Sequence, residues 1–213
     1  ACDDFSTEHP LHRSAVFNGG ACHASNILIM NVAENVEGTK IIVENPENTL
    51  AEYSKRLQLR GTTVGMMTSA SMDSFRQVSR SSQGVEISVL VTAGISNARC
   101  AGDRADWRTF QPDANPTGTI NIIILTNATM SPAGMVESVM LATEAKTVAM
   151  RKLSLKSPVS GTIATGTGTD AIAVANGFGS GTVRYCGKHV LFGEMLASAV
   201  IEAITEALSD RVY

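Results

Sequence analysis

The amino-acid sequence predicts a mixed α/β (α+β) fold, in which a mixed, largely antiparallel β-sheet forms the core and helices cover it in a layered sandwich. Short apolar runs rich in Ile and Val are typical of strands, and longer segments with helical spacing separate some of them. Several runs follow one another without the strict strand–helix alternation of a doubly wound sheet. One core can support 213 residues, so a single domain over residues 1–213 is expected, with a polar, loosely ordered segment at 1–13.

Strands are predicted over the apolar runs at residues 14–17, 27–32, 40–43, 62–68, 85–92, 119–125 and 171–175. The glycine pair at 19–20 predicts a hairpin between the first two runs. The run at 119–125 is dominated by isoleucine, which is typical of a strand buried on both faces, so we expect it at the centre of the sheet. Residues 75–79 fit a helical turn or a strand, and residues 97–117 fit a long loop, which in a compact domain is usually functional or disordered.

Three helices are expected from their start and stop signals. The first begins with a capping box at Thr49 and ends at Gly61. The second is capped by Ser131, is followed at once by a proline and runs to about residue 153. The third covers residues 189–208 and has one apolar face.

The composition excludes several classes of protein. With 44% apolar and 17% charged residues the chain is not disordered, and 17 Lys plus Arg against 20 Asp plus Glu give no cationic surplus for nucleic acid. The longest apolar run is far shorter than the roughly 20 residues that cross a bilayer, and the N-terminus lacks the pattern of a signal peptide. We therefore expect no nucleic-acid or membrane partner and a cytoplasmic location. The sequence leaves open whether the chain is a homo-oligomer or a fragment of a longer protein.

The cysteines and histidines suggest no metal site. Four cysteines lie far apart without a C-x-x-C pair, and the spacing of the histidines at 9, 12 and 23 matches no zinc template. A chain that can build its own core does not need disulfides, so the cysteines are expected to be free thiols. No metal and no cofactor are predicted.

Two turns carry side chains suited to binding or catalysis. Residues 94–98 approximate the nucleophile elbow G-x-S-x-G, but no good helix follows, so a turn leaving the sheet is favoured; Asn97 there could reach a ligand. Residues 165–170 combine three hydroxyls, two glycines and Asp170, which fits either a substrate-binding loop or a tight turn closed by local hydrogen bonds. The dinucleotide-like spacing at 166–171 is coincidental, because a strand and not a helix follows it.

Two further residues are candidates for acid–base chemistry. His189 opens the last predicted helix, and a helix N-terminus favours the neutral imidazole of a general base, although a histidine on a solvated helix start is the commoner explanation. Glu144 lies in an otherwise apolar helix and either faces the sheet or forms an ion pair in solvent.

Several strings together resemble the adenosylcobinamide amidohydrolase family: residues 18–20, 64–68, 92–98, 118–123, 142–147, 165–171 and 187–194. Gly-Thr-Ile-Asn at 118–121 and Thr-Gly-Thr-Gly-Thr-Asp at 165–170 are the most specific. The resemblance implies hydrolysis of the amide that joins the aminopropanol arm to the corrin ring of adenosylcobinamide, giving adenosylcobyric acid in cobamide salvage. The corrinoid is then the substrate and not a cofactor.

On this hypothesis His189 or Glu144 is the acid–base group, and Asp170 orients a hydroxyl, a water or an imidazole. Thr167 or Thr169 is the nucleophile or a donor to the oxyanion. The residues expected to bind the substrate are Asn97, Asn121, Gly94, Gly166, Gly168, Thr68 and Asn18. The sequence does not separate an activated water from a covalent threonine. A corrinoid-binding module without activity and an amidase for another substrate stay open as alternatives.

Overall fold

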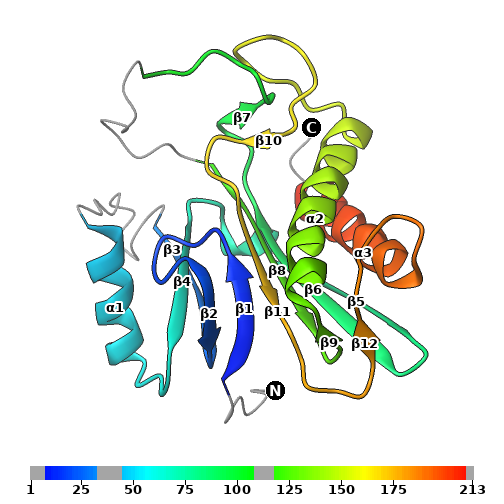
Figure 1. The fold of residues 1–213 in the computed structure, drawn as a ribbon. Coiled ribbons are helices and arrows are strands. Elements are labelled where there is room, and N and C mark those ends of the chain that lie inside the picture. The colour runs from blue at the N-terminus through cyan, green and yellow to red at the C-terminus, as the bar shows by residue number, and fades with distance from the viewer. Residues whose placement is uncertain (1–7, 33–44, 108–117, 210–213) are drawn as a thin grey trace.

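A computed structural model describes residues 8–32, 45–107 and 118–209 (Figure 1). The predicted strand at 40–43 and part of the predicted loop at 97–117 lie outside the described residues. The described chain forms a layered α/β domain around one six-stranded sheet, as the sequence predicts. None of its helices is long and apolar enough to cross a membrane.

The six-stranded sheet is mixed but mainly antiparallel. Its strands, in spatial order, are β2 (Gly20–Ala24), β1 (His9–Arg13), β11 (Ala171–Ala175), β8 (Ile120–Thr126), β6 (Val85–Ala93) and β5 (Arg76–Ser82). Only β8 and β11 pair in parallel within this sheet. The predicted central strand is confirmed, since β8 lies inside the sheet with its residues from Ile120 to Ile124 buried.

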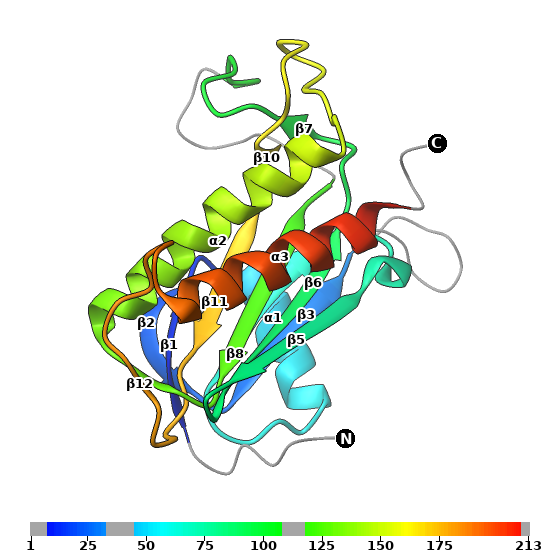
Figure 2. The same cartoon turned by 90° about the vertical axis from the view of Figure 1, so that its right-hand side faces the viewer.

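Two long helices cover one face of the sheet (Figure 2). Helix α2 (Pro132–Lys152) packs on β11, and α3 (Leu191–Ser209) packs on β5, β6 and α2. The side chains of Ile120, Ile122 and Ile124 point into this layer, because alternate residues of a strand face one side. The Ser131 cap is confirmed: its hydroxyl accepts a hydrogen bond from Gly134 N at 3.0 Å, with Pro132 in the first turn.

A smaller layer covers the other face. Strand β3 (Asn26–Asn31) pairs in parallel with β4 (Thr63–Thr68), and helix α1 (Pro46–Arg56) packs on β4. Met66 of β4 packs against Ile123 of β8. Elements at the margins are the 3-10 helix η1 (Met72–Ser74) and two short pairs, β7 (Ala98–Arg99) with β10 (Gly166–Thr167) and β9 (Thr129–Met130) with β12 (Thr182–Val183).

The strand predicted at 27–32 is confirmed as β3, but the predicted N-terminal hairpin was wrong in position. The hairpin is formed by β1 and β2, and not by residues 14–17 with 27–32. Residues 9–13, expected to be loosely ordered, form a strand because Leu11 and Arg13 alternate toward the interior despite the polar composition. Residues 14–18 instead connect the layers, and Phe17 bridges to Gly65 of β4.

Two helix starts also differ from the prediction. Helix α1 begins a turn earlier than Thr49, because the Asn45 side chain caps it by accepting from Asn48 N at 3.0 Å and Pro46 follows. Helix α3 begins at Leu191, so His189 lies in the turn before it. The ambiguous residues 75–79 fall mainly in β5.

Candidate functional site

Four loops converge at one end of the sheet, where β4 and β6 end and β8 and β11 begin (Figure 1). Gly118 N donates to the hydroxyl of Ser69, which joins the loop after β4 to the loop before β8. Gly94 N, just after β6, donates to Thr119 O at 2.9 Å. Thr169 Oγ1, in the loop before β11, donates to Gly118 O at 2.9 Å. These contacts bring most of the predicted site residues together, and we call this region the loop end.

Asn97 is the loop-end residue whose side-chain amide is buried with neither of its polar atoms hydrogen-bonded. Its Oδ1 and Nδ2 atoms are out of contact with water and make no hydrogen bond to any described residue. A Cβ placed on Gly118 would lie 2.6 Å from Asn97 Oδ1, and one on Gly168 would lie 3.3 Å from Nδ2. The two glycines therefore make room for this amide. A buried amide without partners costs free energy, which is characteristic of a group that awaits a ligand.

A cavity of about 250 Å³ opens beside Asn97. Its other lining residues are Arg99, Cys100, Asp103, Arg104, Ala105, Asp106, Trp107 and Gly168. Arg99 Nη2 holds both carboxylate oxygens of Asp106, at 2.8 and 2.6 Å. The cavity thus lies against Asn97, whose amide is buried and unpartnered, and its wall includes fixed charges and the sole tryptophan.

Asp103 in this cavity is a fixed anion. Hydrogen bonds from Ser157 and Ser160 and from the backbone N–H of Cys100 lower the pKa of its carboxyl below the usual 3.8. The Ser157 hydroxyl lies 2.5 Å from Asp103 Oδ2, and Cys100 N lies 2.8 Å from the same oxygen. A carboxylate so occupied stabilises the loop and is a poor candidate for a general base.

Asp170 is likewise saturated with donors. Its Oδ1 accepts from Thr167 Oγ1 at 2.5 Å and from Ile120 N at 3.1 Å. Its Oδ2 accepts from Thr167 N at 3.0 Å and from the ammonium of Lys146. Gly166 is required beside this pair, because a Cβ there would overlap Asp170 Oδ2 and lie 2.6 Å from Lys146 Nζ. The turn closed by local hydrogen bonds is confirmed. Gly168 of the same segment lines the cavity, and substrate binding by this loop stays a prediction.

Gly94 at the loop end and Thr68 and Asn121 beneath it do not line the cavity. Asn121 is fully buried and donates to Met67 O at 2.9 Å, which ties β4 to the main sheet. Thr68 Oγ1 accepts from Ala70 N at 3.1 Å, and a Cβ on Gly94 would lie 3.0 Å from Ala70 Cβ. These three predicted substrate-binding residues thus support the loop after β4. Of these three residues, Asn121 keeps a buried acceptor, Oδ1, that has no partner among the described residues.

His189, Glu144 and Asn18 are not brought to the loop end. Glu144 faces solvent from α2, 53% exposed, and pairs with Lys188, which is 69% exposed; the solvent-facing alternative is therefore confirmed. His189 is exposed in the neighbouring turn. Asn18 adopts a left-handed turn with φ 54° and donates to Thr63 O at 2.8 Å, at the start of β4. The geometry does not join these three to Asp170.

Lys146 is the residue that the sequence predictions missed. It lies two positions after Glu144 and so on the opposite side of α2, among small apolar residues. A lysine in phase with Ala142 and Ala149 was the available signal. Within the described residues, no group of three or more His, Cys, Asp or Glu could hold a metal ion. Cys22, Cys100 and Cys186 are free thiols, as predicted.

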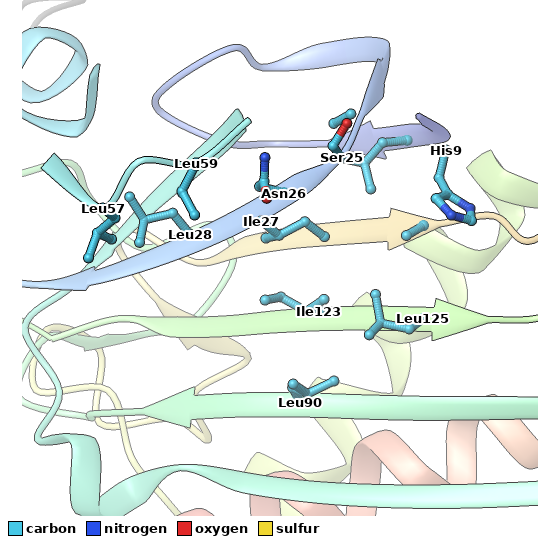
Figure 3. A pocket seen from close by; sticks show the side chains of 13 residues that line it. His9, Ser25, Asn26, Ile27, Leu28, Leu57, Leu59, Leu90, Ile123 and Leu125 are labelled. Atoms are coloured by element: carbon cyan, nitrogen blue, oxygen red, sulfur yellow. The ribbon is translucent and has the colours of Figure 1, made fainter. Parts of the chain in front are cut away.

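A second cavity, of about 310 Å³, lies between the main sheet and β3 (Figure 3). Figure 3 shows Ile27, Leu90 and Ile123 lining it, with His9 at one end and Leu57 at the other. Its walls are mainly apolar, and the Nδ1 of His9 is already bonded to Asn176 O at 2.9 Å. Asn26 at its rim likewise donates to Arg60 O at 2.7 Å, so the loop end, with the unpartnered amide of Asn97, is the better candidate for an active site.

Comparison with known proteins agrees with the resemblance in the sequence. The family model for adenosylcobinamide amidohydrolase matches residues 2–212. An uncharacterized protein of Methanocaldococcus jannaschii is 36% identical over 157 residues, which cover 67% of this chain and 61% of that protein. The adenosylcobinamide amidohydrolase of Methanosarcina mazei is 29% identical over 176 residues, covering 78% of this chain and 76% of that enzyme.

Two more distant likenesses complete the comparison. The adenosylcobinamide amidohydrolase of Halobacterium salinarum is 30% identical over 131 residues, 59% of this chain and 51% of that protein. A crystal structure of a protein from Pyrococcus horikoshii OT3 superposes with a TM-score of 0.33 at 18% identity, covering 68% of this chain and 43% of that one, and no argument rests on it. The chain thus spans 61% of the first relative and about half of the halobacterial one. By the match over residues 2–212, the chain belongs to the adenosylcobinamide amidohydrolase family.

Proposed function

We propose that this chain hydrolyses the amide between the aminopropanol arm and the corrin ring of adenosylcobinamide. Water adds its oxygen to the acyl carbon, the C–N bond breaks, and the nitrogen leaves as the amine with a proton from water. The products are adenosylcobyric acid and aminopropanol, and the reaction would serve cytoplasmic salvage of incomplete corrinoids. Membership of the family supports this activity.

The unpartnered amide of Asn97 carries the proposal. An amide side chain can donate from Nδ2 to a substrate carbonyl and accept on Oδ1 from the substrate N–H, so it matches a carboxamide on both sides. The cavity at the loop end, about 250 Å³, lies below the usual range for whole ligands and is too small for a corrin ring. We infer that the amide arm enters the cavity and that the ring stays outside it.

We infer that the nucleophile is water and not a threonine. Thr167 donates its hydroxyl proton to Asp170, as an activated nucleophile would. If Asp170 took up that proton, however, the buried ammonium of Lys146 would lose its counter-charge, which is costly. Hydroxylamine trapping tests this choice: a covalent acyl-threonine would yield a hydroxamate of the corrinoid, and direct attack by water yields only the acid.

The activity is tested by incubating the purified chain with adenosylcobinamide and separating the corrinoids by chromatography. We expect adenosylcobyric acid and an equal amount of aminopropanol. Binding without release of acid would overturn the proposal in favour of a corrinoid-binding module. Neither binding nor turnover would indicate an amidase for another substrate. Arg80→Met, which removes a cation from the exposed pair with Glu202, is the control for a charge change away from the loop end.

A further inference from the structure

Helix α2 carries one buried charge, and nothing in the proposed chemistry uses it. The helix is described throughout, and of its charged side chains only Lys146 lies among the buried residues. Its side chain is 9% exposed, and that of its partner Asp170 is 10% exposed. This ion pair therefore lies almost wholly out of water, which distinguishes it from the exposed pairs on the same chain.

The pair connects three separate parts of the chain. Lys146 comes from α2, Ile120 N from the start of β8, and Thr167 from the turn before β11, and all three donate to the Asp170 carboxylate. Further along the same turn, Thr119 Oγ1 donates to Thr169 O at 2.6 Å. The turn is thus held from both sides, with Gly168 between the two attachments and against Asn97.

Stability alone does not explain a buried ion pair at this place. Desolvation of two charges is expensive, and apolar residues of similar volume often replace such a pair without loss of stability. Directed hydrogen bonds, in contrast, fix a loop in one geometry. The main effect of the pair is therefore to fix the geometry of the turn, and with it the place of Gly168 relative to the Asn97 amide and the cavity beside it.

We propose that Lys146 is a positioning residue for the hydrolysis: through Asp170 it holds the turn at residues 165–170 against Asn97, so that the substrate amide meets the Asn97 side chain in reactive alignment. Lys146 itself does not touch the substrate. The inference rests on the proposed function, because the alignment matters for the amide that enters this cavity.

Lys146→Met and Lys146→Arg test the inference by kinetics. A misplacement of about 1 Å can cost about 100-fold in rate, so we expect kcat of Lys146→Met to fall about 100-fold while KM for adenosylcobinamide changes less than about threefold. Lys146→Arg restores a cation to Asp170 and should recover kcat to within about tenfold of wild type. Arg80→Met should keep the wild-type kcat. A folded Lys146→Met with wild-type kcat would overturn the inference.

A structural readout separates this inference from the proposed function. Hydrogen exchange at Thr167 N, which is bonded to Asp170, should quicken in Lys146→Met and not in Arg80→Met. The fluorescence of Trp107, the sole tryptophan, should change with it, because Trp107 lines the same cavity as Gly168. If wild type fails to hydrolyse adenosylcobinamide, the proposed function is wrong. If hydrogen exchange and Trp107 fluorescence are unchanged in Lys146→Met, the positioning role is wrong, whatever the activity of wild type. Should Lys146→Met not fold, the double variant with Asp170→Asn removes the unpaired charge and gives the same readouts.

Discussion

The carboxamide oxygen of Asn97 lies where a side chain on Gly118 would have to be, since a Cβ there would be 2.6 Å from it. Gly118 also has φ 91°, in the left-handed region that favours glycine. The start of β8 and the turn after β6 thus fit together only because one of them lacks a side chain. Gly94, Gly166 and Gly168 make similar close approaches at the loop end, where a Cβ would meet Ala70, Asp170 and Asn97 respectively.

Gly118→Ala should lower both stability and activity. A left-handed alanine costs about 1 kcal/mol, and the clash with Asn97 adds about 1 kcal/mol or more. Gly84→Ala is the matched control: Gly84 has φ 78° in the β5–β6 hairpin, and a Cβ there meets nothing within 4 Å. We expect Gly84→Ala to show only the backbone cost in urea unfolding, with wild-type hydrolysis. Equal losses of stability and of activity in the two variants would mean that the contact between Gly118 and Asn97 contributes to neither.

Asn97→Ala should separate activity from stability. Loss of an amide that contacts the reacting group is expected to lower kcat/KM about 100-fold. The free energy of unfolding should stay the same or rise by about 1 kcal/mol, because buried polar atoms without partners disappear. Chemical unfolding and hydrolysis are measured on the same preparation. A variant that loses stability and activity together would show that the amide supports the loop and does not await a ligand.

Local signals in the sequence predicted much of the fold. The Ser131 cap with the following proline and the isoleucine run of β8 need no distant partner to be recognised, and both are confirmed. Strand β1 was missed because its residues, His-Pro-Leu-His-Arg, show no alternation of apolar and polar side chains, and its pairing with β11 joins residues more than 150 positions apart. Asn45 and Pro46 would have placed the start of α1 correctly, as a cap followed by proline at the first helical position.

The candidate site was predicted only in part, because Glu144 was the charged residue of α2 considered to face the sheet, whereas helical phase points to Lys146. At about 100° per residue, Glu144 is about 140° away from Ala149, whereas Lys146 is within about 60° of both Ala142 and Ala149. The buried charge of α2 therefore had to be Lys146. Its partner Asp170 lies 24 positions later in the chain, and no sequence spacing predicts that contact. Asn97 was predicted as a binding residue because it follows a strand end, where loops carry function, and its place beside the cavity is compatible with that role.

Asp103 should make stability depend on acid pH. Hydrogen bonds, chiefly from Ser157, hold the pKa of its carboxyl below 3.8 in the folded chain. Its contribution to stability is therefore complete above pH 3.8 and is lost as the pH falls through the lower, folded pKa. We expect Ser157→Ala to be less stable than wild type at pH 7, with a difference that narrows in acid. Urea unfolding at a series of pH values measures this difference, and in an Asp103→Asn background the effect of Ser157→Ala should not narrow in acid. A difference independent of pH would contradict the assignment.

In the folded protein the Cys186 thiol should not react with thiol reagents, and its ionisation should lower the stability of the fold in alkali. Burial raises the pKa of its thiol above the usual 9.0, and the nearby charge of Glu137 adds to this, while a hydrogen bond with Ser138 opposes it. A raised folded pKa means that the stabilising contribution is complete below pH 9.0 and is lost as the pH rises through the folded pKa. At pH 8, maleimide labelling followed by peptide mapping should find Cys22 and Cys100 modified and Cys186 modified only in urea. Above pH 9, the free energy of unfolding of wild type should fall faster with pH than that of Cys186→Ala. Rapid labelling of Cys186 in the native protein, or an equal fall of the free energy of unfolding with pH in the two proteins, would show that the thiol is open to water.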